Sequence, residues 1–328
     1  MNNAERNFMT AVKAGISRLG LTRIPLAVSF EITTRCTRKC LYCESWKLKR
    51  DELNTHDILG ILDDLADNNT EYLSITGGEP LLRADLPDIV KRAKSLGMKV
   101  GLNTNGDLLP ERIEDLEGVD KLVLSLDGPK HIQDRLRGKG SFDSTMAAIR
   151  LGQSHGIFIG ATAVLTNKNL GSVKDILNLG RDMGIKVRFQ PAYTHRLRAT
   201  DENPAAPGRK DYQDAMRFLI KEKISGNQVI GNSVSVLKYL AGYPGPMNIQ
   251  CAGGSWFMRI RADGKVGICG IGKDRPVPGI DIRDGVKRAM SRLAPPDCSA
   301  CWCSQRTEIN LAWSGHVDAM AGLLKYVF

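Results

Sequence analysis

The chain has 328 residues, of which 42% are hydrophobic and 25% charged. These values are typical of a globular protein with one large domain or a large and a small one. No segment approaches the roughly 18 consecutive apolar residues of a membrane span, and the polar start MNNAERN lacks the order of a secretory signal. We therefore expect a cytoplasmic protein.

The net charge is +10, from 46 basic and 36 acidic residues. A basic surface permits an anionic substrate, a nucleic acid or an anionic membrane as partner. The basic residues are scattered and only 6% of residues are aromatic, so the stacking groove of a nucleic-acid binder is not indicated.

The first segment, residues 1–25, carries Phe8, Val12, Ile16 and Leu19 at helical spacing, with basic residues on its other faces. This pattern predicts a short basic amphipathic helix. We expect it to cap the open end of a barrel; peripheral membrane contact is the alternative.

Strand and helix patterns then alternate along the chain. Apolar residues at helical spacing predict helices at 55–66 and from residue 85 onward. The second helix is expected to end at Gly97, because glycine suits a helix C-cap. Strand patterns occur at 26–32, 72–75, 99–102, 121–126, 159–165 and 185–190. Six such units predict an α/β fold with a parallel sheet, whose chemistry lies at the carboxyl ends of the strands.

The alternation ends near a Pro-, Gly- and charge-rich segment at 201–210, which reads as a linker or an exposed loop. Further on, 256–261 and 265–269 flank an Ala-Asp-Gly264 turn and predict a β-hairpin.

The eight cysteines form two clusters. The first is Cys36-Thr-Arg-Lys-Cys40-Leu-Tyr-Cys43, where three thiolates can hold three irons of a four-iron cluster and leave the fourth iron open to a chelating ligand. A zinc knuckle or a disulfide pair is the alternative. In a reducing cytosol, clustered cysteines indicate metal ligation rather than disulfides.

With these motifs, residues 26 to about 195 resemble a radical S-adenosylmethionine enzyme. The features that carry the match are, in chain order, the Cys36, Cys40 and Cys43 loop with Tyr42 before its last cysteine, Gly77-Gly78-Glu79-Pro80, Ser125, Arg137, Leu165 and Gln190. Each has an ordinary alternative, such as a turn or a surface charge. Their order at successive strand ends makes coincidence a poor explanation.

The resemblance implies how these residues bind S-adenosylmethionine. The 77–79 segment contacts the methionyl amine, and Ser125 and Arg137 hold the ribose and the carboxylate. Leu165 and Gln190 present backbone to the adenine. A 4Fe-4S cluster on the first three cysteines passes one electron into the sulfonium, and a 5′-deoxyadenosyl radical then removes a hydrogen atom from the substrate. Reduced flavodoxin or ferredoxin is the implied electron donor.

The C-terminal cysteines resemble a twitch domain, the shorter relative of the SPASM domain, which holds one auxiliary 4Fe-4S cluster. They are Cys251, Cys269, Cys298, Cys301 and Cys303. Whether Cys301 or Cys303 serves beside Cys298 stays open. A four-cysteine zinc ribbon is the alternative.

The implied architecture is a partial (β/α)6 TIM-like barrel with a small C-terminal hairpin and helix iron-sulfur domain. We divide the chain into the N-terminal helix at 1–25, the barrel at 26–215, and a linker helix plus twitch/SPASM-like domain at 216–328.

Family membership leaves the net reaction open. Because an auxiliary cluster can accept an electron from a substrate radical, our main hypothesis is an oxidoreductase that dehydrogenates a small, anionic or polyhydroxylated molecule. Asp127, Tyr193 and His195 follow strands and are candidates for proton transfer. For His195 a solvated loop histidine is an equally good interpretation.

Three alternatives remain. A ribosomal peptide maturase would crosslink or oxidise a peptide, although only 35 residues precede Cys36, too few for a folded leader-binding domain. A lipid-modifying enzyme would use the basic N-terminal helix at a membrane surface. A non-catalytic zinc or iron-sulfur binding protein would release no 5′-deoxyadenosine on reduction.

Overall fold

The computed structural model describes residues 22–195, 202–246, 248–269, 279–294, 298 and 300–326, and a few positions before residue 22. Phe8, Ile16 and Leu19, which carry much of the predicted amphipathic pattern, lie outside the described residues. Among the described residues, no helix is long and apolar enough to cross a membrane.

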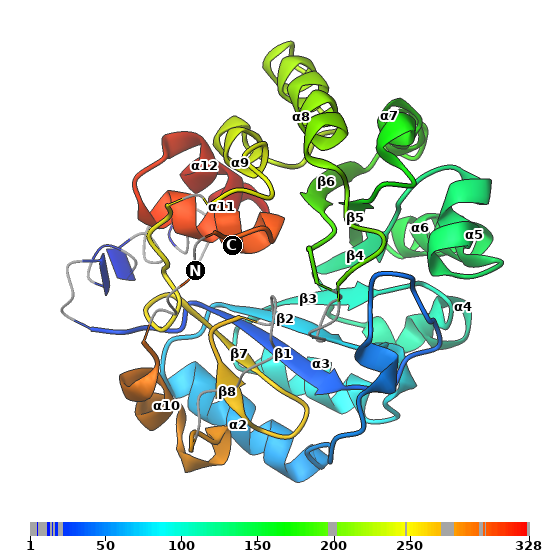
Figure 1. Cartoon of the computed structure of the whole chain (residues 1–328). Coiled ribbons are helices and arrows are strands. Elements are labelled where there is room, and N and C mark those ends of the chain that lie inside the picture. Colours follow the sequence, from blue (N-terminus) through cyan, green and yellow to red (C-terminus); the bar gives the residue numbers. More distant parts are fainter. Residues whose placement is uncertain are drawn as a thin grey trace.

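One eight-stranded sheet organises the molecule, in the order β6-β5-β4-β3-β2-β1-β7-β8 (Figure 1). The strands are β1 (Ala27–Thr33), β2 (Tyr72–Gly77), β3 (Lys99–Thr104), β4 (Lys121–Ser125), β5 (Phe158–Leu165), β6 (Lys186–Pro191), β7 (Phe257–Ile260) and β8 (Val266–Gly267). Strands β1 to β6 pair in parallel with their neighbours. The predicted α/β fold with a partial six-unit barrel is confirmed.

The helices of the barrel lie outside the curved sheet and cover its outer face (Figure 1). Those of the barrel are α2 (Thr55–Asp67), α3 (Leu86–Ser95), α4 (Leu109–Arg112), α5 (Lys130–Arg137), α6 (Ser141–Ser154) and α7 (Val173–Asp182). The later ones are α8 (Arg209–Ile224), α9 (Val234–Leu240), α10 (Val286–Arg292), α11 (Ser304–Trp313) and α12 (Val317–Tyr326). Short 3-10 turns are η1 (Ser45–Lys47), η2 (Pro80–Leu82), η3 (Ile113–Leu116), η4 (Leu170–Ser172) and η5 (Ile282–Asp284).

Helix α2 shows why the helices form where the sequence predicts them. The Asn54 side chain caps its start by accepting a hydrogen bond from the Asp57 amide, which satisfies one of the unpaired donors of the first turn. Its buried residues, spaced by three and four, form the single apolar face that packs on the sheet: Ile58, Ile61, Leu62 and Leu65.

The strands alternate in a way that decides where the cavity lies. In β4, Leu122 and Leu124 are fully buried in the layer beneath the helices, whereas Lys121, Val123 and Ser125 line the inside of the barrel. Closed TIM barrels fill this space with branched aliphatic side chains. Here polar as well as apolar side chains line it, and the barrel interior holds a cavity rather than a packed core.

The predicted hairpin is also present, and it joins the barrel's own sheet. Strand β7 pairs in parallel with β1, and β8 pairs antiparallel with β7. A buried ion pair between Glu31 of β1 and Arg259 of β7 ties the two strands together. The division of the chain at residues 215 and 216 stays a prediction.

Candidate active site

The barrel holds a cavity of about 340 Å³. Its walls are the inner faces of β2 to β6, and one end is closed by the cysteine loop that follows β1. Cys303, the residue before α11, also lines this cavity, so the first and second cysteine clusters face it together. The carboxyl ends of the strands therefore form the predicted functional edge of the sheet.

Cys36, Cys40 and Cys43 all line the cavity and are partly buried. Burial raises the pKa of the Cys36 thiol to about 11, with smaller contributions from the nearby Cys40 and Cys43 as negative charges. Burial likewise raises the pKa of Cys40. Thiolates crowded in a buried loop need a cationic partner, and this donor set fits an iron-sulfur cluster. Among the described residues, no three such groups converge tightly enough to hold a single metal ion.

Two glycines allow the end of β2 to touch the start of the cysteine loop. A Cβ on Gly77 would lie 2.4 Å from the Thr33 carbonyl oxygen, and one on Gly78 would lie 2.1 Å from that of Arg35. Such contacts are too short for any side chain, so this close approach requires glycine. The amide of Gly78 in turn donates to the Thr33 carbonyl at 2.9 Å. Both glycines line the cavity.

Glu79 lies behind those glycines and is fully buried. Its carboxylate accepts hydrogen bonds from the Leu81 amide at 3.1 Å, the Thr104 hydroxyl at 2.8 Å and the Asn105 amide at 2.8 Å. The carboxylate thus joins the ends of β2 and β3. The resemblance implied that the 77–79 segment contacts the cofactor directly. For Glu79, the geometry instead favours a role in positioning the cavity wall.

Burial raises the pKa of Glu79 to about 7, above the unfolded value near 4.5. Between these two values the folded protein holds a proton that the unfolded chain has lost, so stability must fall as pH rises through this window. We expect the loss to reach roughly 3 kcal/mol by pH 7.5. Urea unfolding of the wild type and of Glu79→Gln at pH 5 and 7.5 measures it. Equal pH slopes in the two proteins would contradict this assignment.

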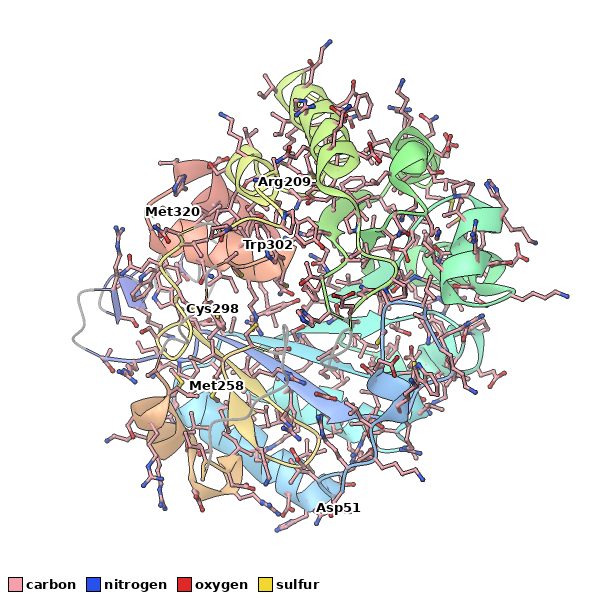
Figure 2. All side chains as sticks on the ribbon, in the orientation of Figure 1. Asp51, Arg209, Met258, Cys298, Trp302 and Met320 are labelled. Carbon is pink, nitrogen blue, oxygen red and sulfur yellow. The ribbon has the colours of Figure 1, made fainter. Side chains whose placement is uncertain are left out.

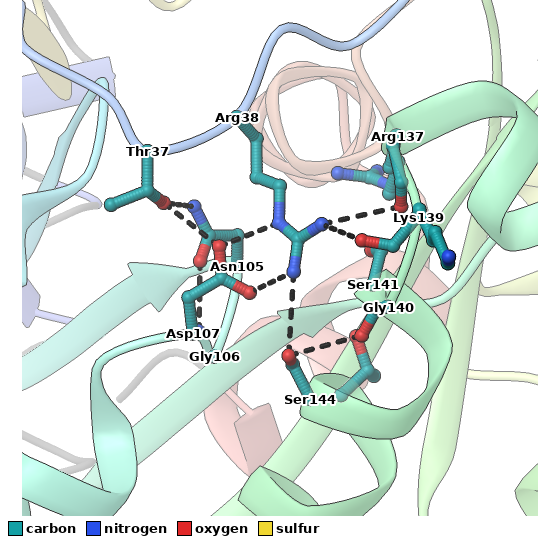
Figure 3. Close-up of polar contacts among 12 residues, drawn as sticks. Thr37, Arg38, Asn105, Gly106, Asp107, Arg137, Lys139, Gly140, Ser141 and Ser144 are labelled. Atoms are coloured by element: carbon teal, nitrogen blue, oxygen red, sulfur yellow. Dashed lines mark hydrogen bonds and ion pairs between the residues drawn. The ribbon is translucent and has the colours of Figure 1, made fainter.

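Arg38 anchors the cysteine loop to two other loops (Figure 3). Its guanidinium donates to both carboxylate oxygens of Asp107, to the carbonyls of Gly138 and Lys139 at 3.2 and 2.8 Å, and to the Ser144 hydroxyl at 3.3 Å. These partners lie after β3, between α5 and α6, and in the first turn of α6. The loop is therefore held by contacts about 70 to 100 residues away in sequence.

A second group of hydrogen bonds supports the same loop (Figure 3). The Thr37 hydroxyl donates to Asp107 at 2.9 Å, and the Asn105 side-chain amide donates to Thr37 at 2.9 Å. The same Asn105 amide lies 3.9 Å from the Cys36 sulfur. The order of the cysteine loop thus depends on the Asn-Gly-Asp turn after β3.

Replacing Arg38 by glutamine should loosen this loop. Because the pair with Asp107 is bidentate and mostly buried, we expect a loss of about 1.5–3 kcal/mol in the free energy of unfolding. Faster hydrogen exchange over 36–43 should accompany it. The matched control is Arg92→Gln, whose pair with Asp63 is exposed and should cost at most about 1 kcal/mol. Equal losses in both variants would refute the anchoring role.

Asp127 forms the buried centre of a third group. It is fully buried and accepts hydrogen bonds from the Tyr42 hydroxyl and the Arg137 Nε, both at 2.6 Å, and from the Val164 amide at 2.8 Å. Arg137 also reaches to 3.9 Å from the Cys40 sulfur. Asp127 was a candidate proton acceptor. With its carboxylate committed to these donors, the geometry favours a positioning residue that holds Arg137 and Tyr42 at the cavity wall.

The remaining cofactor candidates differ in placement. Ser125 and Gln190 line the cavity. Gln190 also accepts a hydrogen bond from the Ser304 amide at 3.1 Å, which ties β6 to the start of α11. Leu165 is fully buried, and its carbonyl accepts from the Ala192 amide at 2.7 Å. Its neighbour Val164 lines the cavity in its place.

The other two catalytic candidates have different surroundings. Tyr193 forms a hydrogen bond with Cys303, and burial, together with nearby cysteines, raises its pKa well above the ordinary value. His195 is exposed, in contact with the Thr194 hydroxyl at 3.1 Å. This placement favours the solvated loop histidine over a proton acceptor for substrate.

The C-terminal cysteines gather beside α11. Burial raises the pKa of Cys301. The nearby Cys269, Cys303 and Cys251 raise this pKa as well, as negative charges. Cys298 is exposed. Trp302, labelled in Figure 2, packs against Tyr243 with ring centroids 5.3 Å apart. These thiols form a second group suited to an iron-sulfur cluster.

Sequence reasoning missed two sets of residues. Neither Arg38 nor Asp107 was a predicted site residue, and only their long-range pairing shows that they anchor the loop. Of the inward side chains of β4 and β6, Ser125 and Gln190 were predicted site residues, whereas Lys121, Lys186 and Arg188 were not. Their signal was present, because Lys121, Val123 and Ser125 alternate with buried leucines, and a strand covered on both faces should be apolar throughout.

These features define an α/β barrel enzyme with clustered thiols at the carboxyl edge of its strands. The Radical SAM superfamily model matches residues 30–180. The chain is also 30% identical over 257 residues to the PqqA peptide cyclase of Ruegeria pomeroyi, covering 75% of this chain and 67% of that protein. The chain therefore belongs to the radical S-adenosylmethionine superfamily, whose members use a 4Fe-4S cluster and S-adenosylmethionine.

A second relative is the AdoMet-dependent heme synthase of Methanosarcina barkeri, 26% identical over 77% of this chain and 78% of that protein. The share of the curated relatives' length that this chain spans varies widely, from 40% to 78%. Among solved structures, native anSMEcpe with bound AdoMet and a Kp18Cys peptide has the same fold. Its TM-score is 0.66 at 20% identity, covering 82% of this chain and 80% of that one.

Proposed function

We propose that this enzyme modifies a peptide substrate by hydrogen-atom abstraction. The observation that carries the proposal is the cavity, which runs inside the barrel from the cysteine loop to the amino ends of β4, β5 and β6 and is lined by side chains of five strands. A channel of this kind suits an extended chain segment. The likeness to a peptide cyclase supports the same conclusion, as does the peptide in the anSMEcpe structure.

This proposal replaces our main hypothesis of small-molecule dehydrogenation with one of its alternatives. The number of residues before Cys36 was an argument against a peptide maturase. The similarity to a peptide cyclase is the stronger argument, so we set the first aside. Net oxidation of the peptide remains part of the proposal, because a second thiol group faces the same cavity through Cys303.

The residues of the site divide the work as follows. When bound, the cluster and S-adenosylmethionine supply the radical that removes the hydrogen atom. Cys36, Cys40 and Cys43 would hold the cluster. Arg137 lies at the cavity wall beside Cys40, where its guanidinium can bind a carboxylate. The backbone at Gly78 lines the same wall, so it can approach the cofactor closely.

Further residues would complete the binding. Ser125 offers a hydroxyl to the ribose, and Gln190 lines the wall where β6 ends. The second group of thiols would hold one auxiliary 4Fe-4S cluster, drawn from Cys251, Cys269, Cys301 and Cys303, with Cys298 as the exposed fifth. Reduced flavodoxin or ferredoxin would supply the electron.

Anaerobic turnover tests the proposal. Reconstituted protein, S-adenosylmethionine and dithionite are mixed with short peptides encoded beside the gene, and peptide mass and 5′-deoxyadenosine are measured. We expect a peptide product that has lost two hydrogens. With a peptide deuterated at the reacting carbon, label should move into 5′-deoxyadenosine.

Two outcomes would refute the peptide proposal. One is turnover of small alcohols, amines or tetrapyrroles with all peptides unchanged. That result would support the small-molecule hypothesis or a function similar to that of the heme synthase. The other is about two zinc ions per chain with no cleavage of S-adenosylmethionine, which would leave a binding protein.

A further inference from the structure

The end of the cavity opposite the cysteines is basic. Lys121 of β4 and Lys186 and Arg188 of β6 all line it, near the amino ends of their strands. Phe158, the first residue of β5, also lines it and is 46% exposed, so the cavity reaches the surface here. The Lys121 ammonium lies 5.4 Å from the Phe158 ring centroid. None of these residues belongs to the group around the cysteine loop.

Three glycines make room for the long polar side chains in this part of the barrel. A Cβ on Gly101 would lie 2.0 Å from the Tyr72 hydroxyl oxygen. One on Gly231 would lie 3.0 Å from Arg188 Cγ, and one on Gly160 would lie 3.5 Å from Lys121 Cε. Tyr72 lines the cavity as well. The small residues opposite these side chains keep space inside the barrel that an alanine would reduce.

One polar atom at this end of the cavity is left unsatisfied by the described residues. The Arg188 Nη2 atom is buried and makes no hydrogen bond to any described residue. Burial, with a smaller contribution from the positive charge of Arg188, lowers the pKa of Lys121 to about 7, which shows that the two cations lie close together. Glu308 of α11 interacts with Arg188 electrostatically. Burial, however, raises the pKa of the Glu308 carboxyl and so disfavours its charged form. A bound anion would relieve the repulsion and satisfy Nη2.

We propose that Lys121, Lys186 and Arg188 form a binding site for a carboxylate of the substrate, at the end of the barrel away from the cluster. The proposal rests on the proposed function for its source, an acidic side chain of the peptide. Lys121 and Ser125 are the two ends of β4, so the carboxylate would bind roughly 13 Å from the level where the radical forms. The site would set which residue of the peptide meets the radical.

Equilibrium binding tests the site apart from turnover. The probes are acetyl-Gly-Gly-Glu-Gly-Gly-amide and its Gln counterpart, titrated calorimetrically into anaerobically reconstituted protein at low ionic strength. We expect the Glu probe to bind at least about tenfold more tightly than the Gln probe. In Arg188→Gln the preference should fall to within about twofold. The matched control, Arg181→Gln on the exposed face of α7, should keep it.

Lys121→Met provides a second variant, so the test survives if Arg188→Gln fails to fold. Equal binding of the two probes to the wild type would overturn the site, and so would a preference that persists in both variants. Glutarate, which carries a carboxylate without a peptide, separates the two proposals. If glutarate binds as tightly as the Glu probe and depends on Arg188, the site stands and the peptide source fails.

Discussion

Replacing Asp127 by asparagine is expected to lower the free energy of unfolding by about 3–5 kcal/mol. The variant would leave the Arg137 guanidinium, which is only 9% exposed, without the charge that compensates it. Burial of an unpaired cation is among the costliest single changes in a folded protein. Urea unfolding of the anaerobically purified protein measures the loss.

The same change should weaken binding of S-adenosylmethionine, because Arg137 would lose its fixed position at the cavity wall. Tyr42→Phe is the matched control. It removes one hydrogen bond to Asp127 and keeps the ion pair, so its expected cost is about 1 kcal/mol. If both variants lost the same stability, the ion pair would not be the centre of this group.

The second large effect is expected for Gly78→Ala. The new Cβ would lie 2.1 Å from the Arg35 carbonyl oxygen, and a backbone atom cannot rotate away as a side chain does. The cysteine loop and the end of β2 must then separate. Since a displacement of about 1 Å at a reacting centre can cost a hundredfold in rate, we expect release of 5′-deoxyadenosine to fall at least about 100-fold.

Gly60→Ala is the control for that prediction. Gly60 lies in α2, and no heavy atom lies within 4 Å of its ideal Cβ. The substitution should therefore leave cleavage unchanged and stabilise the helix by roughly 0.5–1 kcal/mol. Full activity in Gly78→Ala would mean that the loop does not need this close approach.

The predicted helices and strands agree closely with the structure because each rests on local patterning. The buried face of α2 follows from the spacing of its apolar residues, and the six parallel strands follow from apolar runs separated by helices. The cysteine loop was equally readable, since its three thiols lie within eight residues and their spacing carries the chemistry. The placement of that loop after β1 puts it at the carboxyl edge of the sheet.

The roles of single side chains could not be predicted in this way. Asp127 was a candidate proton acceptor because it follows a strand, but its partners Tyr42, Arg137 and Val164 come from three other parts of the chain. Likewise, the union of the hairpin with β1 depends on a contact between residues more than 220 apart. Such pairings leave no periodic mark in the sequence.

By itself, the sequence determined the class of fold and the cysteine loop, because spacing and short-range periodicity encode both. Its resemblance to known enzymes indicated the radical S-adenosylmethionine family. Only the tertiary structure decided which polar residues line the cavity and which support its wall. It gave Arg38, Glu79 and Asp127 supporting contacts, and it left Lys121 and Arg188 facing the cavity. The physical reason is that the cost of burying a charge depends on partners that folding brings together from distant parts of the chain.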